Sequence, residues 1–318
     1  MWAKRTSKMN GTIESLISLA MIFIMIVPGL VLGRKNVITE EQSLGLTGIV
    51  TNLTWPCLVI DAMQIPFSFE ILKSCGYITV IMLVIFLISW LISQLLVKIT
   101  SMDKGHSYLF TFMIMFANTG FMGLPIINAI YGKDATFYAS IAEMVNDILI
   151  FSIGIIFIQK AAGKHEGVNM KDLFTPGMIG VLIGFALFLL NVRLPGFLGD
   201  SINLIGSATT PITMIAVGMQ IGRMKVKDVF SGSTIYIMSF VKLIFLPLLT
   251  YLIFYIVLGD KSLLANVVVM DFAMPAAMCT SIFSQQYGAD YQFASKGVLI
   301  TTLLSIVTIP LFTVLLSL

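Results

Sequence analysis

The chain has 318 residues, of which 58% are hydrophobic and only 11% are charged, and its mean hydropathy is +0.98. Soluble domains carry charge on about a quarter of their residues, so this composition excludes a soluble globular protein and indicates an integral membrane protein. The net charge of +3 gives nucleic acid no extended basic surface to bind.

Ten apolar segments of membrane-spanning length follow one another along the chain. A helix needs about 20 apolar residues to cross the hydrocarbon core. Segments such as 80–88 are apolar on every face, which argues against the alternating strands of a membrane barrel. The predicted spans are 13–32, 44–63, 74–97, 108–130, 135–158, 173–191, 202–221, 233–257, 263–285 and 292–316.

Basic residues in the connecting loops predict the orientation of the chain. Loops on one side carry ten lysines and arginines, and loops on the other side carry four. Cytoplasmic loops are enriched in these residues, so we expect the first group in the cytoplasm, the N-terminus outside, and the protein in the inner or plasma membrane. Lys4, Arg5 and Lys8, before the first span, argue against this orientation. The ten are Arg34, Lys35, Lys98, Lys104, Lys160, Lys164, Lys171, Arg223, Lys225 and Lys227, and the four are Lys73, Lys133, Arg193 and Lys261.

Polar residues lie beside a proline near the middle of the second and seventh spans. The second span contains Asn52, Thr54 and Pro56, and the seventh contains the run 209–211, which reads TTP. We expect Asn52 and Thr54 to face a polar cavity and to contact a solute there. Helix packing by small hydroxyl residues is the alternative.

The fourth span is interrupted by residues 116–126, which read FANTGFMGLPI. Pro125 has no N–H for the carbonyl four residues earlier, so the helix opens at mid-span. An unpaired backbone group in hydrocarbon costs several kcal/mol, so such a break is tolerated only where protein or water satisfies it. We predict that the break lines a cavity, where Asn118, Thr119, Gly120 and Pro125 bind the solute. Close helix packing at the glycines is the alternative.

Two carboxylates, Glu143 and Asp147, lie four residues apart on one face of the fifth span. A charged residue inside a span costs about 2.5–3.5 kcal/mol on insertion scales and is a functional candidate. Repulsion between two such carboxylates favours a pair that loads and releases a proton. A structural tie to a basic or hydrogen-bonding group is the alternative, as is a shift of the span toward its loop. Asn146 adjoins the pair and is expected to point off its face.

The eighth and ninth spans each contain one charged residue near the middle, Lys242 and Asp271. Pro275 follows Asp271 by four residues and therefore frees the Asp271 carbonyl, so that side chain and backbone together offer oxygens to a cation. We expect Asp271 and Pro275 to line the same site as the fourth-span break. Lys242 is expected to be the counter-ion of Asp147 or Asp271, either as a structural salt bridge or in ion coupling.

The second half of the chain repeats landmarks of the first. Residues 131–134, which read YGKD, reappear as 287–290, which read YGAD, at a displacement of 156. The prolines of spans 2 and 7 lie 155 residues apart, and those of spans 4 and 9 lie 150 apart. We therefore predict two five-helix repeats, 1–158 and 173–318, joined by a cytoplasmic linker at 159–172. Because each repeat has an odd number of spans, the second is inverted, as in many secondary transporters.

At these motifs the sequence resembles the auxin efflux carrier family, which includes plant auxin exporters and bacterial carriers of malonate and malate. The matching residues are 118–125 (NTGFMGLP), 242–247 (KLIFLP), 274–277 (MPAA) and 287–290 (YGAD), and the likeness extends over nearly the whole chain. The long cytoplasmic loop of the plant exporters is missing, so the chain looks like the short bacterial form. The resemblance implies a ten-helix fold shared with bile-acid sodium symporters, with helices 4 and 9 broken and crossing. It also implies a scaffold domain of helices 1, 2, 6 and 7 and a transport domain of helices 3–5 and 8–10.

These observations predict a secondary active transporter that moves a small organic anion by alternating access, with the two breaks forming the site. A broken helix offers free N–H groups to a carboxylate at one end and free carbonyls to a cation at the other. We expect proton coupling first, sodium coupling second and uncoupled, potential-driven movement third. A channel or sensor on the same fold is the alternative, and catalysis is not expected. We expect no metal and no cofactor beyond a coupling ion, with the anion, the bilayer and a second copy in a homodimer as partners.

Overall fold

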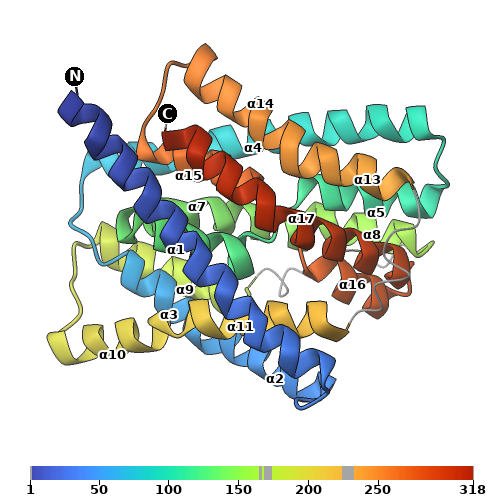
Figure 1. Ribbon diagram of the computed structural model, residues 1–318, viewed down its shortest axis with the longest axis horizontal. Helices are drawn as coiled ribbons and strands as arrows, with labels where there is room; N and C mark the ends of the chain where they lie inside the picture. Colours follow the sequence, from blue (N-terminus) through green and yellow to red (C-terminus); the bar gives the residue numbers. More distant parts are fainter. Residues whose placement is uncertain (1, 165–166, 168–173, 224–232, 318) are drawn as a thin grey trace.

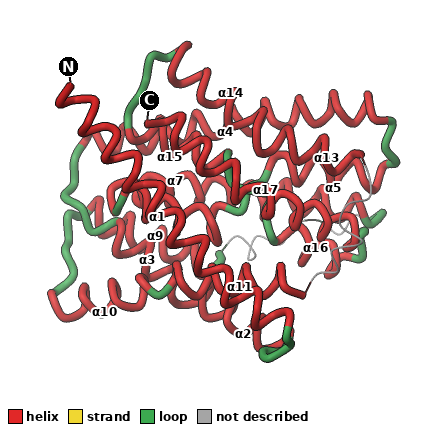
Figure 2. Tube along the Cα trace, viewed as in Figure 1, coloured by secondary structure: helices red, strands yellow, loops and turns green. Residues whose placement is uncertain are grey.

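Figure 1 shows the chain in a computed structural model, which describes residues 2–164, 167, 174–223 and 233–317, without the side chains of 2–12 and 40. The tube in Figure 2 is helical almost everywhere outside short connections. Seven helices of the described part are long and apolar enough to cross a membrane, and three shorter apolar helices accompany them. An all-α, multi-pass membrane protein is therefore confirmed. Lys171, Lys225, Lys227 and much of the predicted linker 159–172 lie outside the described residues.

The first half of the chain contains one long uninterrupted helix at each of its first and third predicted spans, and composite segments at the others. The elements are α1 (Trp2–Arg34), α2 (Glu40–Ile49), the π-helical turn η1 (Val50–Thr54), α3 (Trp55–Ala62), α4 (Phe69–Thr100), α5 (Lys104–Met115), η2 (Thr119–Gly123), α6 (Leu124–Tyr131), α7 (Lys133–Leu149), η3 (Ile150–Gly154) and α8 (Ile155–Ala161).

The second half also contains both continuous and composite segments. Its elements are α9 (Pro176–Leu189), α10 (Gly196–Ser207), α11 (Thr209–Arg223), α13 (Ser233–Phe240), η5 (Val241–Phe245), α14 (Leu246–Leu252), η6 (Ile253–Val257), α15 (Leu263–Phe272), α16 (Cys279–Tyr287) and α17 (Tyr291–Ser317). The region of the predicted seventh span consists of two helices, α10 and α11, with only Ala208 between them, a division that the apolar pattern did not indicate.

Three of the π-helical turns come directly before a proline. η1, η2 and η5 are each followed by a helix whose second residue is proline: Pro56 in α3, Pro125 in α6 and Pro247 in α14. Proline cannot donate to the carbonyl four residues earlier, and a π turn absorbs the displaced hydrogen bonding by widening the coil. The prolines therefore do more than end helices, because they reorient the residues of the turn before them.

Glycines let α1 and α11 approach each other more closely than any side chain would permit. Gly29 and Gly33 on α1 face Gly218 and Gly222 on α11, and each pair has the four-residue spacing of membrane helix contacts. A Cβ atom at Gly218 would lie 2.1 Å from the Ile26 carbonyl oxygen, which is far inside van der Waals contact. This backbone contact makes the α1 and α11 pair the most closely associated helices of the described structure.

The helices surround a central region where the interrupted segments meet. In Figure 1, α1 and α17 run side by side diagonally across the molecule, and they are in contact. α3 packs against α9 and α10, while α7 packs against α6, α4 and α15. The turns η1 and η2 both contact α11, so the interruptions of two different segments lie against one helix.

Candidate functional site

The breaks in the fourth and ninth segments cross each other and pair through their backbones. α5 ends at Met115, and α15 ends at Phe272. Between these ends and the next helices, Ala117 and Ala276 form an isolated antiparallel bridge. The Asn118 N–H donates to the Pro275 carbonyl at 2.8 Å, and the Ala277 N–H donates to the Phe116 carbonyl at 3.1 Å. Each break thus satisfies backbone groups that the other leaves open, as the hydrocarbon interior requires.

Two side chains from other helices complete the backbone hydrogen bonding at the crossing. The buried Thr301 hydroxyl of α17 accepts from the Ala276 N–H at 3.2 Å. Lys242, in η5, is fully buried, and its ammonium donates to the Ile114 carbonyl at 3.1 Å. That carbonyl belongs to the last turn of α5, where a cation is favoured by the helix dipole.

The expected pairing of Lys242 with Asp147 or Asp271 is not what the structure shows. No carboxylate of the described residues forms an ion pair with the Lys242 ammonium, although Asp271 is near enough for their charges to interact. A helix that ends inside the membrane leaves carbonyls without donors, and the lysine binds one of them instead. The direct role of Lys242 is therefore to cap a helix end.

A hydrogen-bonded group of side chains joins the first break to α7. The Thr119 hydroxyl donates to Glu143 Oε2, and the Asn146 amide nitrogen donates to Thr119 Oγ1 at 3.0 Å and to Glu143 Oε2 at 3.3 Å. All three side chains are buried. The expectation that Asn146 points away was wrong, because residues three apart on a helix lie on the same face.

Trp55, at the start of α3, covers this group from the opposite side. A Cβ atom at Gly120 would lie 2.7 Å from Glu143 Oε1 and 2.9 Å from Trp55 Cη2, so only glycine leaves room between the carboxylate and the indole ring. The Trp55 ring also contacts Phe121, with ring centroids 6.4 Å apart. Trp55 was not among the predicted site residues, and its one signal in the sequence is a large polar aromatic residue directly before a mid-span proline.

Asp147 and Asp271 are also buried near the crossing. Asp147 lies one turn after Glu143 on α7, and Asp271 lies in the last turn of α15, which packs on α7. An acid at the carboxyl end of a helix faces a negative dipole, an arrangement that favours a cation close by. The structure therefore gathers three acidic side chains around one helix crossing.

Several buried polar atoms at this place have no hydrogen-bond partner among the residues that the structure describes. Two of them are donors, the Asn118 amide nitrogen and the Trp55 indole nitrogen, and one is an acceptor, the Asn146 amide oxygen. The hydroxyl groups of Thr54 and Thr209 are unpartnered as well. Buried polar groups without a partner are rare in proteins, and each one calls for an explanation such as a bound molecule. Their elements pack against one another, since η1 and η2 contact α11 and both α3 and η2 contact α7.

The other residues predicted to bind a solute have different positions. Asn52 is exposed, and its amide nitrogen donates to the Gly48 carbonyl of its own helix at 2.7 Å, so it is not brought to the crossing by any hydrogen bond. Thr54 is buried in η1. Pro125 is buried at the start of α6, and Pro275 lies in the crossing itself.

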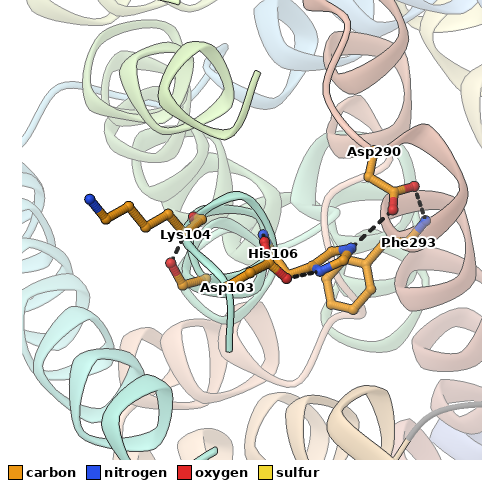
Figure 3. Close-up of polar contacts among 6 residues, drawn as sticks. Asp103, Lys104, His106, Asp290 and Phe293 are labelled. Carbon is orange, nitrogen blue, oxygen red and sulfur yellow. Dashed lines mark hydrogen bonds and ion pairs between the residues drawn. The ribbon is translucent and has the colours of Figure 1, made fainter. Parts of the chain in front are cut away.

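A second polar group lies away from the crossing, where α5 and α17 begin. Figure 3 shows the His106 ring between the carboxylates of Asp103 and Asp290, with the Phe293 ring beside it. His106 Nε2 lies 2.9 Å from Asp290 Oδ2, and Nδ1 contacts Asp103. Asp103 caps α5, and Asp290 accepts from the Phe293 N–H at 2.9 Å. The histidine therefore connects the starts of two helices that are distant in sequence.

The two carboxylates of this group favour a protonated imidazole. Burial lowers the pKa of His106, but the hydrogen bonds and charges of Asp290 and Asp103 outweigh it and hold that pKa above its ordinary value. The Asp103 pKa is lowered, chiefly by the His106 backbone N–H. Burial raises the pKa of Asp290, but the Phe293 N–H and His106 lower it more. The two carboxylates thus stabilise the protonated imidazole relative to the neutral ring.

Comparisons with known proteins identify one matching family and several similar proteins. The profile of a family described as "Membrane transport protein" matches residues 15–313. An uncharacterized transporter of Methanothermobacter thermautotrophicus is 24% identical over 306 residues, covering 96% of this chain and 99% of its own. A lysosomal cholesterol signaling protein of Mus musculus is 26% identical over 89% of this chain and 35% of its own length. A proposed malonate transporter of Rhizobium meliloti is 24% identical over 61% of this chain and 62% of its own.

Proposed function

Because this chain belongs to the membrane transport protein family, as its resemblance to auxin efflux carriers indicated, we propose that it is a secondary active transporter of a small organic anion. The observation that carries the proposal is the pair of crossed breaks, beside which the buried side-chain amide of Asn118 has no acceptor in the described part of the chain. The anion would bind at this crossing and be released on alternate sides of the membrane as the surrounding helices move.

An anion fits the donors found at the crossing. The first N–H groups of a helical segment have no partner inside it and carry the positive end of the helix dipole, and Asn118 stands at that position before η2. A carboxylate accepts hydrogen bonds only, so it satisfies such donors. The likeness to a proposed malonate transporter agrees with a carboxylate as the transported group.

Alternating access requires two groups of helices that move relative to each other. We propose a scaffold of α1, α2, η1, α3 and α9–α11 and a transport domain of the remaining helices, arranged as two inverted five-helix repeats with the N-terminus outside, in the plasma or inner membrane. The packing of α1 on α11 and of α3 on α9 and α10 supports a scaffold that stays together.

An ionic contact connects the two proposed groups. Lys133, at the start of α7, donates to Asp61 Oδ1 at 2.9 Å, and Asn203 of α10 donates to Asp61 Oδ2 at 3.0 Å. The pair is partly exposed, so it is weak enough to open during a transport cycle.

Proton coupling is the driving force that the acids favour. Glu143 belongs to the same hydrogen-bonded group as Thr119, beside the unpartnered Asn118, so a proton on Glu143 or Asp147 changes the charge next to the bound anion. Sodium held by Asp271 is the second candidate, although the Asp271 carbonyl, which Pro275 was expected to free, accepts from the Met274 N–H at 3.3 Å. Uncoupled movement driven by the membrane potential is the third. A homodimer is the assembly we propose.

Uptake by the purified protein in proteoliposomes tests the proposal. We expect labelled malonate, malate, indole-3-acetate or acetate to accumulate when the vesicle lumen is alkaline relative to the outside, and we expect Asn118→Ala to abolish this uptake without loss of folded protein. Transport of none of the four acids, or full transport by the Asn118→Ala variant, would refute the proposal.

A sensor is a second candidate function, because 89% of this chain is similar to the lysosomal cholesterol signaling protein of Mus musculus. A sensor binds its ligand without moving it across the membrane. Ligand-induced stabilisation of the protein together with zero flux in proteoliposomes would favour this second function.

A further inference from the structure

The Trp55 ring lies directly against the hydrogen-bonded group of Thr119, Glu143 and Asn146. We propose that Trp55 contacts the transported solute, and that its indole N–H donates a hydrogen bond to the same anion that the Asn118 amide binds. This inference rests on the proposed function. It assigns the anion two donors that come from two different helical segments, α3 and the break before η2.

The burial of the indole N–H is the first observation. Trp55 is only 7% exposed, and its indole nitrogen has no acceptor among the described residues. Buried tryptophans normally find an acceptor for this group, because losing its hydrogen bond to water costs free energy. A ligand acceptor accounts for both the burial and the missing partner.

The direction of the ring is the second observation. The atoms of Trp55 nearest to a Cβ at Gly120 are Cη2 at 2.9 Å and Cζ2 at 3.1 Å, and Glu143 Oε1 lies 2.7 Å from the same point. The end of the six-membered ring at Cη2 and Cζ2 therefore packs on Gly120, beside the Glu143 carboxylate. The indole nitrogen is bonded to Cε2, the ring carbon next to Cζ2, so the N–H lies on the Cζ2 side of the ring.

The position of Trp55 is fixed from the other side as well. A Cβ at Gly177, in α9, would lie 3.0 Å from Trp55 Cη2, and a Cβ at Gly180 would lie 2.9 Å from the Pro56 Cα. The ring thus fills the space between a glycine of η2 and a glycine of α9. In the proposed transporter these two glycines belong to the transport domain and the scaffold, so an anion held by Trp55 and Asn118 would contact both.

The N–H can be removed while most of the ring stays. Trp55→Phe keeps an aromatic ring between Gly120 and Gly177 but has no donor, and Trp90→Phe is the matched control because Trp90 lies on α4 with 37% of its surface exposed. A hydrogen bond to a charged acceptor corresponds to about a ten- to hundredfold change in affinity. We expect that loss in Trp55→Phe and no change in Trp90→Phe.

The assay is thermal stabilisation of the purified protein by malonate, malate, indole-3-acetate and acetate, followed by titration with the acid that stabilises the wild type most. Tryptophan emission provides a second readout that a packing role would not produce. In the Trp2→Phe, Trp90→Phe background, Trp55 is the one tryptophan left, and we expect saturating acid to shift its emission.

The results of these measurements distinguish failure of the inference from failure of the proposed function. The inference is overturned if Trp55→Phe binds the acid with unchanged affinity, or if the emission of the single tryptophan does not change when the acid binds. The proposed function stands in that case if Asn118→Ala still loses binding. If Trp55→Phe does not fold, the emission measurement decides alone. If none of the four acids stabilises or enters vesicles with the wild type, the proposed function fails and the inference fails with it.

Discussion

Replacing Glu143 separates its structural role from its proposed role in proton coupling. The side-chain hydrogen bonds to its carboxylate from Thr119 and from Asn146 end on the same oxygen, Oε2. A glutamine can place its single oxygen there and keep these two bonds, whereas an alanine keeps neither. We therefore expect Glu143→Gln to be nearly as stable as the wild type.

The cost of Glu143→Ala follows from the Thr119 hydroxyl, which would lose its acceptor, whereas the Asn146 amide nitrogen keeps its bond to Thr119 Oγ1. One unsatisfied buried donor costs about 1–3 kcal/mol of unfolding free energy. Thermal unfolding in detergent should show a large fall in the melting temperature for the alanine variant only. Glu14→Gln is the control, because Glu14 is exposed on α1.

Transport by the Glu143→Gln variant then tests the role of the Glu143 charge separately from its hydrogen bonds. Glu143→Gln cannot release a proton, so we expect accumulation of the acid driven by a pH gradient to fall at least about tenfold. This fall corresponds to a loss of about 1.4 kcal/mol of driving free energy. Counterflow exchange of the same acid at equal pH should continue. Wild-type accumulation by a stable Glu143→Gln variant would refute this reasoning, as would equal destabilisation by glutamine and alanine.

Three further results are expected. Lys242→Met should lower the unfolding free energy by about 1–3 kcal/mol, because the α5 carbonyl that the lysine binds is left buried without a donor, and unchanged melting would contradict its capping role. The pKa of His106 is raised in the folded protein, so protonated His106 stabilises the fold. This contribution is fully present below the ordinary histidine pKa of about 6.5 and is lost as pH rises through the pKa of the folded state. The melting temperature of the wild type should therefore fall more steeply than that of His106→Gln above about pH 6.5, and parallel curves would exclude this contribution. Gly218→Ala should reduce the yield of folded protein because its Cβ would lie 2.1 Å from a backbone oxygen of α1, whereas Gly45→Ala, which meets nothing within 4 Å, should not.

Local chemistry predicted which spans are interrupted, but not the place of each interruption. The predicted spans 108–130 and 263–285 are broken, at 116–118 and 273–278. The second break contains Pro275, but the first lies before η2, and the chain is helical through Pro125. Pro28 and Pro310 lie inside the continuous helices α1 and α17, so a proline in an apolar run does not by itself break a helix. The division of the chain into two inverted repeats and two domains remains a prediction.

The partners of the breaks could not be derived from the sequence. The bridge between Ala117 and Ala276 uses backbone groups, which every residue has, so no pattern of side chains in the sequence predicts it. The same applies to Lys242, for which a carboxylate was the obvious partner and a backbone carbonyl is the actual one. Asn146 is a different case, because helical spacing places it beside Glu143 and would have predicted the contact.

Trp55 illustrates why part of a site escapes sequence reasoning altogether. Its neighbours are Gly120 and Gly177, which have no side chains, and the contact depends on the absence of atoms at those two positions. Such complementarity appears only when distant segments are placed together in space.

A disulfide between the two breaks is the most direct test of the account. Ala117 and Ala276 face each other as a non-hydrogen-bonded antiparallel pair, whose Cα atoms are typically about 4.5 Å apart, within disulfide range. In a variant whose native cysteines, Cys57, Cys75 and Cys279, are replaced, Ala117→Cys and Ala276→Cys should cross-link rapidly under mild oxidant. The cross-linked protein should still be stabilised by the acid that binds the wild type. Failure to cross-link, or anion binding that persists when Asn118 is replaced by alanine in the cross-linked protein, would contradict a site built at the crossing.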